Sequence, residues 1–384
     1  MKGRIDYIDG LRAIAVLSVV VHHAAKYDQN LSVGPLQHTL VEGAHGVDLF
    51  FVISGFVLSY PTLARLHAGS GASFDVARYL AHRFIRILPP YYFAVGLGCL
   101  VLYAVTRLHL TMPWGIVGPN VTPLEVLKQL VFFDNHPQLV NGSFWSLAVE
   151  FRWYFAFPLL LVLWTRSKRA FALLAVVLVV VANLTRAGAL DMAIMPAFMA
   201  GIVAADIEIR QLPLRRLAPL LAILALCIAL AVEPKEPYEF YARVQVGWQL
   251  TAFFTVVAVG AIPWLKKLLS ARPIVAIGIV SYSIYLVHEP LVGITLANTS
   301  WGFFGAVAVG VGAGALFWFP CERPFMATSL KEKLSGVLQP PIARLLAWVG
   351  IPREIQFDQT ASVSAVQGFA VRPAPEMGPR RVNV

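Results

Sequence analysis

The sequence predicts an all-α protein, a polytopic transmembrane helix bundle with about ten spans. Of its 384 residues, 58% are hydrophobic and only 14% are charged, which excludes an ordinary soluble enzyme. The apolar residues form long runs without two-residue alternation, and a spanning helix needs about 20 mostly apolar residues. In lipid each segment must satisfy its own backbone groups, which favours helices. We place the spans near residues 11–25, 46–60, 87–105, 145–165, 170–187, 190–208, 217–232, 245–265, 274–292 and 301–319.

The first run is predicted to be a retained span, although its length would also suit a signal peptide. Arg12, His22 and His23 interrupt it, no A-x-A cleavage site follows, and many spans come later. The positive-inside rule places both termini in the cytoplasm and explains the net charge of +10 without a nucleic-acid partner. The basic connections on which this orientation rests lie at residues 2–4, 65–86, 166–169, 210–216 and 266–272.

Two units are expected along the chain. Residues 1–326 form the membrane domain. Residues 327–384 form a cytoplasmic tail in which proline accumulates, so its last part is predicted to be disordered. Within this tail, residues 342–349 are either a short amphipathic helix on the membrane surface or an ordinary part of the tail. The three cysteines lie far apart without C-x-x-C spacing and indicate neither a disulfide framework nor a metal site.

Polar residues inside the apolar runs are the first candidates for function, since a charge at the bilayer centre costs about 2.5–3.5 kcal/mol on insertion scales. Arg12 and His23 are eleven residues apart in the first span. They therefore face the same side of a helix, roughly 16 Å apart along its axis. We expect both to line one polar track through the membrane. The alternatives are an interfacial Arg12 paired with Asp9, and a His23 that is bonded within the bundle.

Three further polar sites follow along the chain. Asp48 opens the second predicted span, where it either orients the histidine or is an N-terminal acid favoured by the helix dipole. Ser146 and Glu150 share one face of the fourth span, and Glu150 is either a second acid in the same cavity or half of an ion pair. Arg83 and Arg86 lie one turn apart at the cytoplasmic entrance to the third span. Their two guanidinium groups either bind a phosphate-bearing ligand or only anchor the helix at the cytoplasmic face of the membrane.

Short motifs occur in an order that resembles one family, the acyltransferase-3 integral membrane acyltransferases, which include bacterial O-antigen and exopolysaccharide O-acetyltransferases. Hydrolase, zinc-protease and nucleotide-loop signatures are absent from the sequence. The matching motifs are I-D-G-L-R at residues 8–12 with His23 after it, G-V-D-L-F-F-V-I-S-G-F at 46–56, R-x-x-R at 83–86, W-S-L-A-V-E at 145–150, Y-S-I-Y-L-V-H at 282–288 and E-R-P-F at 322–325.

The resemblance implies transfer of an acyl group, commonly acetyl from acetyl-CoA, to a hydroxyl of an extracytoplasmic carbohydrate or glycolipid. It places the enzyme in a bacterial inner membrane, with essential roles for Arg12 and His23. His23 would act as general base or acyl carrier, with Arg83 and Arg86 at the donor side. The other candidates are two acids that assist His23 and three substrate contacts, namely Asp48 and Glu150, and Ser146, Trp145 and His288.

The alternative function is a proton-coupled transporter or flippase of a glycan precursor, in which Arg12, Asp48 and Glu150 form a relay. Glu150 is followed by Phe-Arg-Trp where relatives often carry another acid or a glutamine, which leaves the acceptor contacts there open. We expect no metal and no fused esterase-like domain, and the sequence leaves a homo-oligomer open. His288 and Glu289 precede a proline in the ninth span, where either can be structural.

Overall fold

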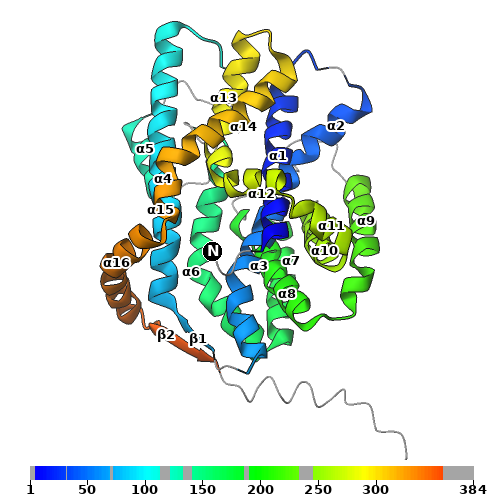
Figure 1. The fold of residues 1–384 in the computed structure, drawn as a ribbon, viewed down its shortest axis with the longest axis vertical. Helices are drawn as coiled ribbons and strands as arrows, with labels where there is room; N and C mark the ends of the chain where they lie inside the picture. The colour runs from blue at the N-terminus through cyan, green and yellow to red at the C-terminus, as the bar shows by residue number, and fades with distance from the viewer. Residues whose placement is uncertain are drawn as a thin grey trace, which may run out of the picture.

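The described part of the chain is almost entirely helical, which confirms the predicted all-α class. The structure, a computed structural model, describes residues 5–31, 33–69, 72–112, 122–132, 141–185, 190–232 and 245–357. Its helices form an elongated bundle (Figure 1). The elements in chain order are α1 (Asp6–Tyr27), α2 (Pro35–Val41), η1 (Glu42–His45), α3 (Gly46–His67), β1 (Ala72–Asp75), α4 (Val76–Leu108), α5 (Pro123–Leu130), α6 (Phe144–Arg166), α7 (Lys168–Thr185), α8 (Leu190–Arg210), α9 (Leu214–Val232), α10 (Gln245–Ala261), α11 (Pro263–Leu269), α12 (Arg272–Ile279), α13 (Ser281–Asn298), α14 (Gly302–Cys321), α15 (Arg323–Met326), α16 (Thr328–Trp348) and β2 (Glu354–Phe357).

Seven helices in these ranges are long and apolar enough to cross a membrane, and two bent helix pairs raise the number to nine. The pairs are α10 with α11 and α12 with α13, which bend by 102° and 69°. The first bend lies at Pro263, which has no N–H to continue the ladder of α10 and instead begins α11. The chain is a multi-pass integral membrane protein. The run predicted near 170–187 forms α7, which lies outside the set of nine.

Helix α1 lies in the interior of the bundle, against α3, α12 and α13 (Figure 1). Its apolar side chains are closely packed, and Leu11, Val16 and Val20 are fully buried. Because protein rather than lipid encloses most of α1, His23 finds polar partners on α13, and Arg12 lies 4.0 Å from Asp9 of the same helix.

Two glycines allow α3 and α8 to approach each other closely. A Cβ atom on Gly55 would collide with the α8 backbone, and a Cβ atom on Gly201 would collide with the α3 backbone. Small residues commonly permit such backbone contact between membrane helices. The α3–α8 pair therefore supports the cavity wall that α3 contributes.

The chain after α14 folds back along α4 (Figure 1). Helix α16 packs against α4, and Ile342 and Leu346 are buried. Strand β2 then pairs antiparallel with β1, with Ala72 opposite Phe357. The predicted surface helix at residues 342–349 is thus the C-terminal part of the longer α16, which ends at Trp348. The predicted disordered part of the tail falls on residues 358–384, which lie outside the described residues.

Candidate active site

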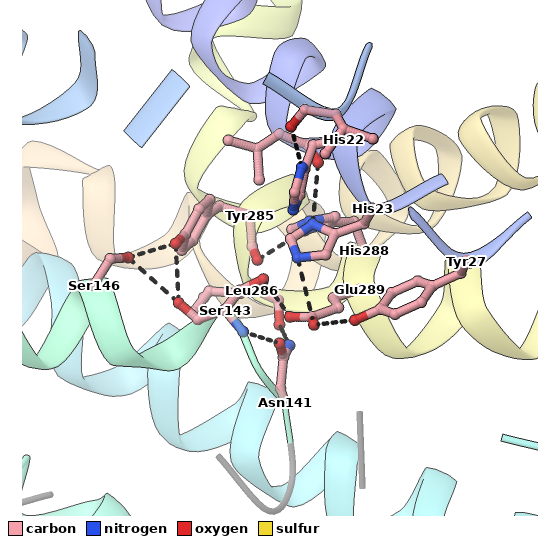
Figure 2. A network of polar contacts seen from close by, with 12 residues as sticks. His22, His23, Tyr27, Asn141, Ser143, Ser146, Tyr285, Leu286, His288 and Glu289 are labelled. Carbon is pink, nitrogen blue, oxygen red and sulfur yellow. Dashed lines mark hydrogen bonds and ion pairs between the residues drawn. The ribbon is translucent and has the colours of Figure 1, made fainter. Parts of the chain in front are cut away.

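A buried polar cluster surrounds His23 near one end of α1 (Figure 2). His23 Nε2 lies 3.4 Å from Glu289 Oε1, and His23 Nδ1 lies 3.0 Å from His288 Nε2. Glu289 accepts hydrogen bonds from the Tyr27 hydroxyl at 2.8 Å and from the Ser143 hydroxyl at 2.6 Å. The side chain of His23 is 12% exposed and that of Glu289 is 4% exposed. In such a closed site each polar contact is strong.

The neighbours of the two histidines indicate where their protons lie. His288 Nδ1 faces the carbonyl oxygens of Ile284 and Tyr285 at 3.1 and 3.0 Å, so the neutral ring carries its proton there and Nε2 is an acceptor. His23 Nδ1 faces that acceptor and the carbonyl oxygen of Val19 at 3.0 Å, so it also carries a proton. His23 Nε2 is left facing a carboxyl oxygen, and a stable contact needs one proton between these two atoms.

The segment before α6 holds Glu289 in place. Asn141 donates through Nδ2 to the carbonyl oxygen of Leu286 at 2.7 Å and accepts from the Ser143 N–H at 2.9 Å. Gly142 lies directly against the Glu289 carboxylate, and a Cβ atom there would collide with it. The sequence N-G-S at residues 141–143 therefore forms a tight cradle for the carboxylate beside His23 (Figure 2).

An open cavity lies along the other end of α1, with about 850 Å³ of space when the solvent at its mouth is included. Arg12, Arg83 and Arg86 line it together with Glu150 and residues of α3. Arg12 lies 4.0 Å from Asp9. Within the described residues, neither Arg83 nor Arg86 forms a hydrogen bond or an ion pair, and Arg83 Nε is buried without a partner. The predicted donor-side residues thus gather around one cavity.

Ser146 and Tyr285 line the same cavity, whereas His23, His288 and Glu289 are not on its wall. The Tyr285 hydroxyl donates to the carbonyl oxygen of Ser143 at 2.9 Å and contacts the Ser146 hydroxyl. The ring of Tyr285 lies 5.8 Å from the ring of His288. Arg12 and His23 therefore face two neighbouring polar regions, with Tyr285 between them, rather than the single track that the sequence suggested.

Two predicted acids lie away from His23. Asp48 Oδ2 lies 2.8 Å from Nδ1 of His45, whose ring stacks on Trp248 at 4.2 Å between centroids. Glu150 accepts a hydrogen bond from Ser54 at 2.5 Å on the cavity wall. Within the described residues, the contacts of Asp48 and Glu150 thus do not include His23, and Glu289 lies beside the imidazole instead.

The remaining predicted contacts lie on both sides of Tyr285. Ser146 is on the cavity wall, and His288 is buried against His23. Trp145 packs against the hydrophobic core and does not line the cavity. The useful sequence signal for Glu289 was an acid next to a histidine inside an apolar run, since such a group needs an internal partner. In the described ranges no group of three or more His, Cys, Asp or Glu residues could hold a metal ion.

Comparison with known proteins shows which family the chain belongs to. A family model described as an acyltransferase domain matches residues 5–321. The chain is 24% identical over 328 residues to the peptidoglycan O-acetyltransferase OatA of Listeria monocytogenes, covering 75% of this chain and 49% of that protein. It is 27% identical over 326 residues to the putative peptidoglycan O-acetyltransferase YrhL of Bacillus subtilis, covering 74% and 48%. It is also 30% identical over 192 residues to nodulation protein 10 of Rhizobium leguminosarum, covering 46% and 49%.

The chain thus spans about half the length of these curated relatives. No solved structure matches it. The family match includes α1, the cavity and the cluster around His23, which together make up the candidate site. The chain belongs to the acyltransferase-3 family of integral membrane acyltransferases.

Proposed function

We propose that this protein is an O-acyltransferase that moves an acyl group, commonly acetyl, from cytoplasmic acyl-CoA to a hydroxyl of an extracytoplasmic carbohydrate or glycolipid. The observation that carries the proposal is the pairing of two polar regions along α1. One holds a histidine against a buried carboxyl group, and the other is a cavity lined by three arginines. The names of two relatives, a peptidoglycan O-acetyltransferase and a putative peptidoglycan O-acetyltransferase, agree with this class of reaction.

The donor fits the cavity by charge. Coenzyme A carries phosphate groups, and the guanidinium groups of Arg83 and Arg86 have no carboxylate partner among the described residues. Arg12 adds a third positive group on the same wall. The pantetheine arm would lie along the cavity, which brings the thioester toward Ser146 and Tyr285 at its far end. This places the arginine end of α1 on the cytoplasmic side and the His23 end on the opposite side.

His23 is the general base in this scheme. Its Nε2 and the Glu289 carboxyl group share one proton, and their 3.4 Å contact is long enough for an acceptor hydroxyl to replace it. The hydroxyl proton passes to His23, the hydroxyl oxygen bonds to the acyl carbon, and the carbon–sulfur bond breaks. The proton then returns to the sulfur, so that the products are an ester and a free thiol. Alternatively, His23 Nε2 accepts the acyl group first.

Tyr285 must move for this reaction to occur, since its hydroxyl closes the end of the cavity against Ser143 and Ser146. The same serine that anchors Tyr285 through its carbonyl oxygen anchors Glu289 through its hydroxyl. Opening of the Tyr285 contact is therefore linked to the position of the carboxyl group beside His23. This link gives the site a means to admit the thioester only when the base is in place.

The test uses full-length protein purified in detergent and supplied with acetyl-CoA and an acceptor glycan. Wild-type protein should release free thiol and acetylate the glycan, and His23→Ala should abolish both while the protein still folds. His67→Ala is the matched control, because His67 pairs with Asp206 outside the site. A transporter would consume no acetyl-CoA, and retained acyl transfer in His23→Ala would refute the proposed role of this histidine.

A further inference from the structure

Helix α16 packs against α4, which carries two arginines of the donor cavity, although α16 follows the part of the chain that matches the family. The match ends at residue 321, and α16 begins at Thr328 and packs along α4 (Figure 1). Helix α4 carries Arg83 and Arg86, which line the cavity. The face of α4 that receives α16 is therefore next to the arginine-lined entrance.

An ion-pair cluster fixes this contact. Glu332 on α16 accepts hydrogen bonds from Arg78 at 3.0 and 3.1 Å and lies 3.7 Å from His82 Nε2. Arg78, His82 and Arg86 are spaced by four residues, so they form one stripe along α4. Glu332 binds the first two members of the stripe, and Arg86 is the next member one turn farther along. The residue before Glu332 is Lys331, which this contact brings to the same region.

The charges around Lys331 are mainly positive. Burial lowers the pKa of the Lys331 ammonium group, and the nearby guanidinium groups of Arg83 and Arg86 lower it further. The carboxylate next to it, Glu332, is already bonded to Arg78. Three cations held together in this way repel one another, and an anion that binds between them removes this repulsion.

Two other acids lie near the arginines but have partners of their own. Glu150 accepts a hydrogen bond from Ser54, and the buried Glu322 accepts one from Ser283 at 2.6 Å. With Asp9, which lies 4.0 Å from Arg12, these acids number three against the four cations Arg12, Arg83, Arg86 and Lys331. The excess positive charge therefore lies at and beside the cavity, which is the arrangement expected of a site for a polyanion.

We propose that α16 forms the outer wall of the donor entrance and that Lys331 binds a phosphate group together with Arg83 and Arg86. The inference rests on the proposed function, because the ligand is taken to be the phosphate-bearing end of the acyl donor. An anionic lipid headgroup offers the same chemistry at this position. The segment from Thr328 to Phe357 is then part of the binding site, with β2 anchoring its end to β1.

The test compares Lys331→Ala with Lys333→Ala in the full-length protein. Lys333 is exposed on the same helix, about 200° farther around it, so it changes the net charge equally without facing α4. The measurement is the Kd for coenzyme A in detergent. Lys331→Ala should bind coenzyme A about tenfold more weakly, because it loses one charge-assisted hydrogen bond. The Kd of Lys333→Ala should stay within about twofold of the wild-type value, and Lys331→Arg should restore the wild-type Kd.

A second arm identifies the source of the phosphate. The thermal stability of each variant is measured in nanodiscs of phosphatidylcholine with and without phosphatidylglycerol. If the lipid is the ligand, Lys331→Ala alone loses the stabilisation by phosphatidylglycerol and keeps its affinity for coenzyme A. If neither quantity changes while Arg83→Ala weakens coenzyme A binding, this inference is refuted and the proposed function stands. If wild-type protein binds no coenzyme A, the proposed function and the donor assignment both fail.

Discussion

Replacement of Glu289 by glutamine is the sharpest test of the cluster around His23. Gln has nearly the same volume and keeps one acceptor oxygen, but it cannot hold the proton shared with His23 Nε2. In the wild-type protein the carboxylate accepts hydrogen bonds from the Tyr27 hydroxyl at 2.8 Å and from the Ser143 hydroxyl at 2.6 Å. The NH₂ group of Gln cannot accept a hydrogen bond, so it must face one of these hydroxyls or the imidazole nitrogen without replacing the lost contact. The substitution thus removes charge and proton exchange with little change in shape.

The expected size of the effect follows from these contacts. A hydrogen bond to a charged group contributes about 1.5–3 kcal/mol, and about 1.36 kcal/mol corresponds to a tenfold change in rate. Loss of one such contact at the transition state therefore lowers kcat about 10- to 150-fold. The KM for acetyl-CoA should stay within about twofold of wild type, because Glu289 is not on the cavity wall.

The assay follows thiol release at saturating glycan while acetyl-CoA is varied, with thermal stability in detergent measured in parallel. The control is Glu150→Gln, which changes an acid on the cavity wall that binds Ser54 and should mainly change the KM for acetyl-CoA rather than kcat. Wild-type kcat in Glu289→Gln would refute the shared-proton interpretation. A rise in KM alone would show that Glu289 serves donor binding instead.

Three other changes have definite expected outcomes. Gly142→Ala should lower kcat about as much as Glu289→Gln with an unchanged KM for acetyl-CoA, because its methyl group displaces the carboxylate. Gly201→Ile should lower the Tm by several degrees or prevent folding, since it separates α3 from α8, and thermal shift measures this. Hydrogen bonds from Arg78 lower the pKa of Glu332, so its contact is fully present above the ordinary glutamate pKa of about 4 and is lost only as the pH falls through the lowered value. Hydrogen exchange of α16 should therefore stay unchanged between pH 6 and about pH 4 and rise in more acidic buffer, and this rise should be absent in Glu332→Gln.

The spans were predictable from the sequence because lipid demands long apolar segments with internally satisfied backbones. Spacing along one helix was equally informative, since it placed Arg12 and His23 on one side of α1. The bends between α10 and α11 and between α12 and α13 were harder to predict from the sequence. A proline at residue 263 could be read as a break, but the 69° bend between α12 and α13 has no proline at the break itself.

Partners across helices could not be predicted in the same way. Glu289 and His23 are 266 residues apart, and only the packing of α13 against α1 brings them together. Asp48 was predicted to assist His23 because it lies at the start of an apolar span. In the structure, His45 in the preceding turn is its partner. Charge count alone also did not reveal that α16 returns to α4, since Lys331 and Glu332 look like ordinary residues of a basic tail.

The pairing of β1 with β2 has a consequence for how the protein is made. Its two strands lie on either side of the segment from α4 to α16, so the ribosome must complete every helix in that segment before the strands can meet. Contacts between such distant segments close late, after local helices and hairpins have formed. The donor site beside Arg83 and Arg86 therefore acquires the wall proposed for α16 only after that helix has been made. A nascent chain arrested before residue 328 would contain the membrane helices but would lack α16 beside the donor site.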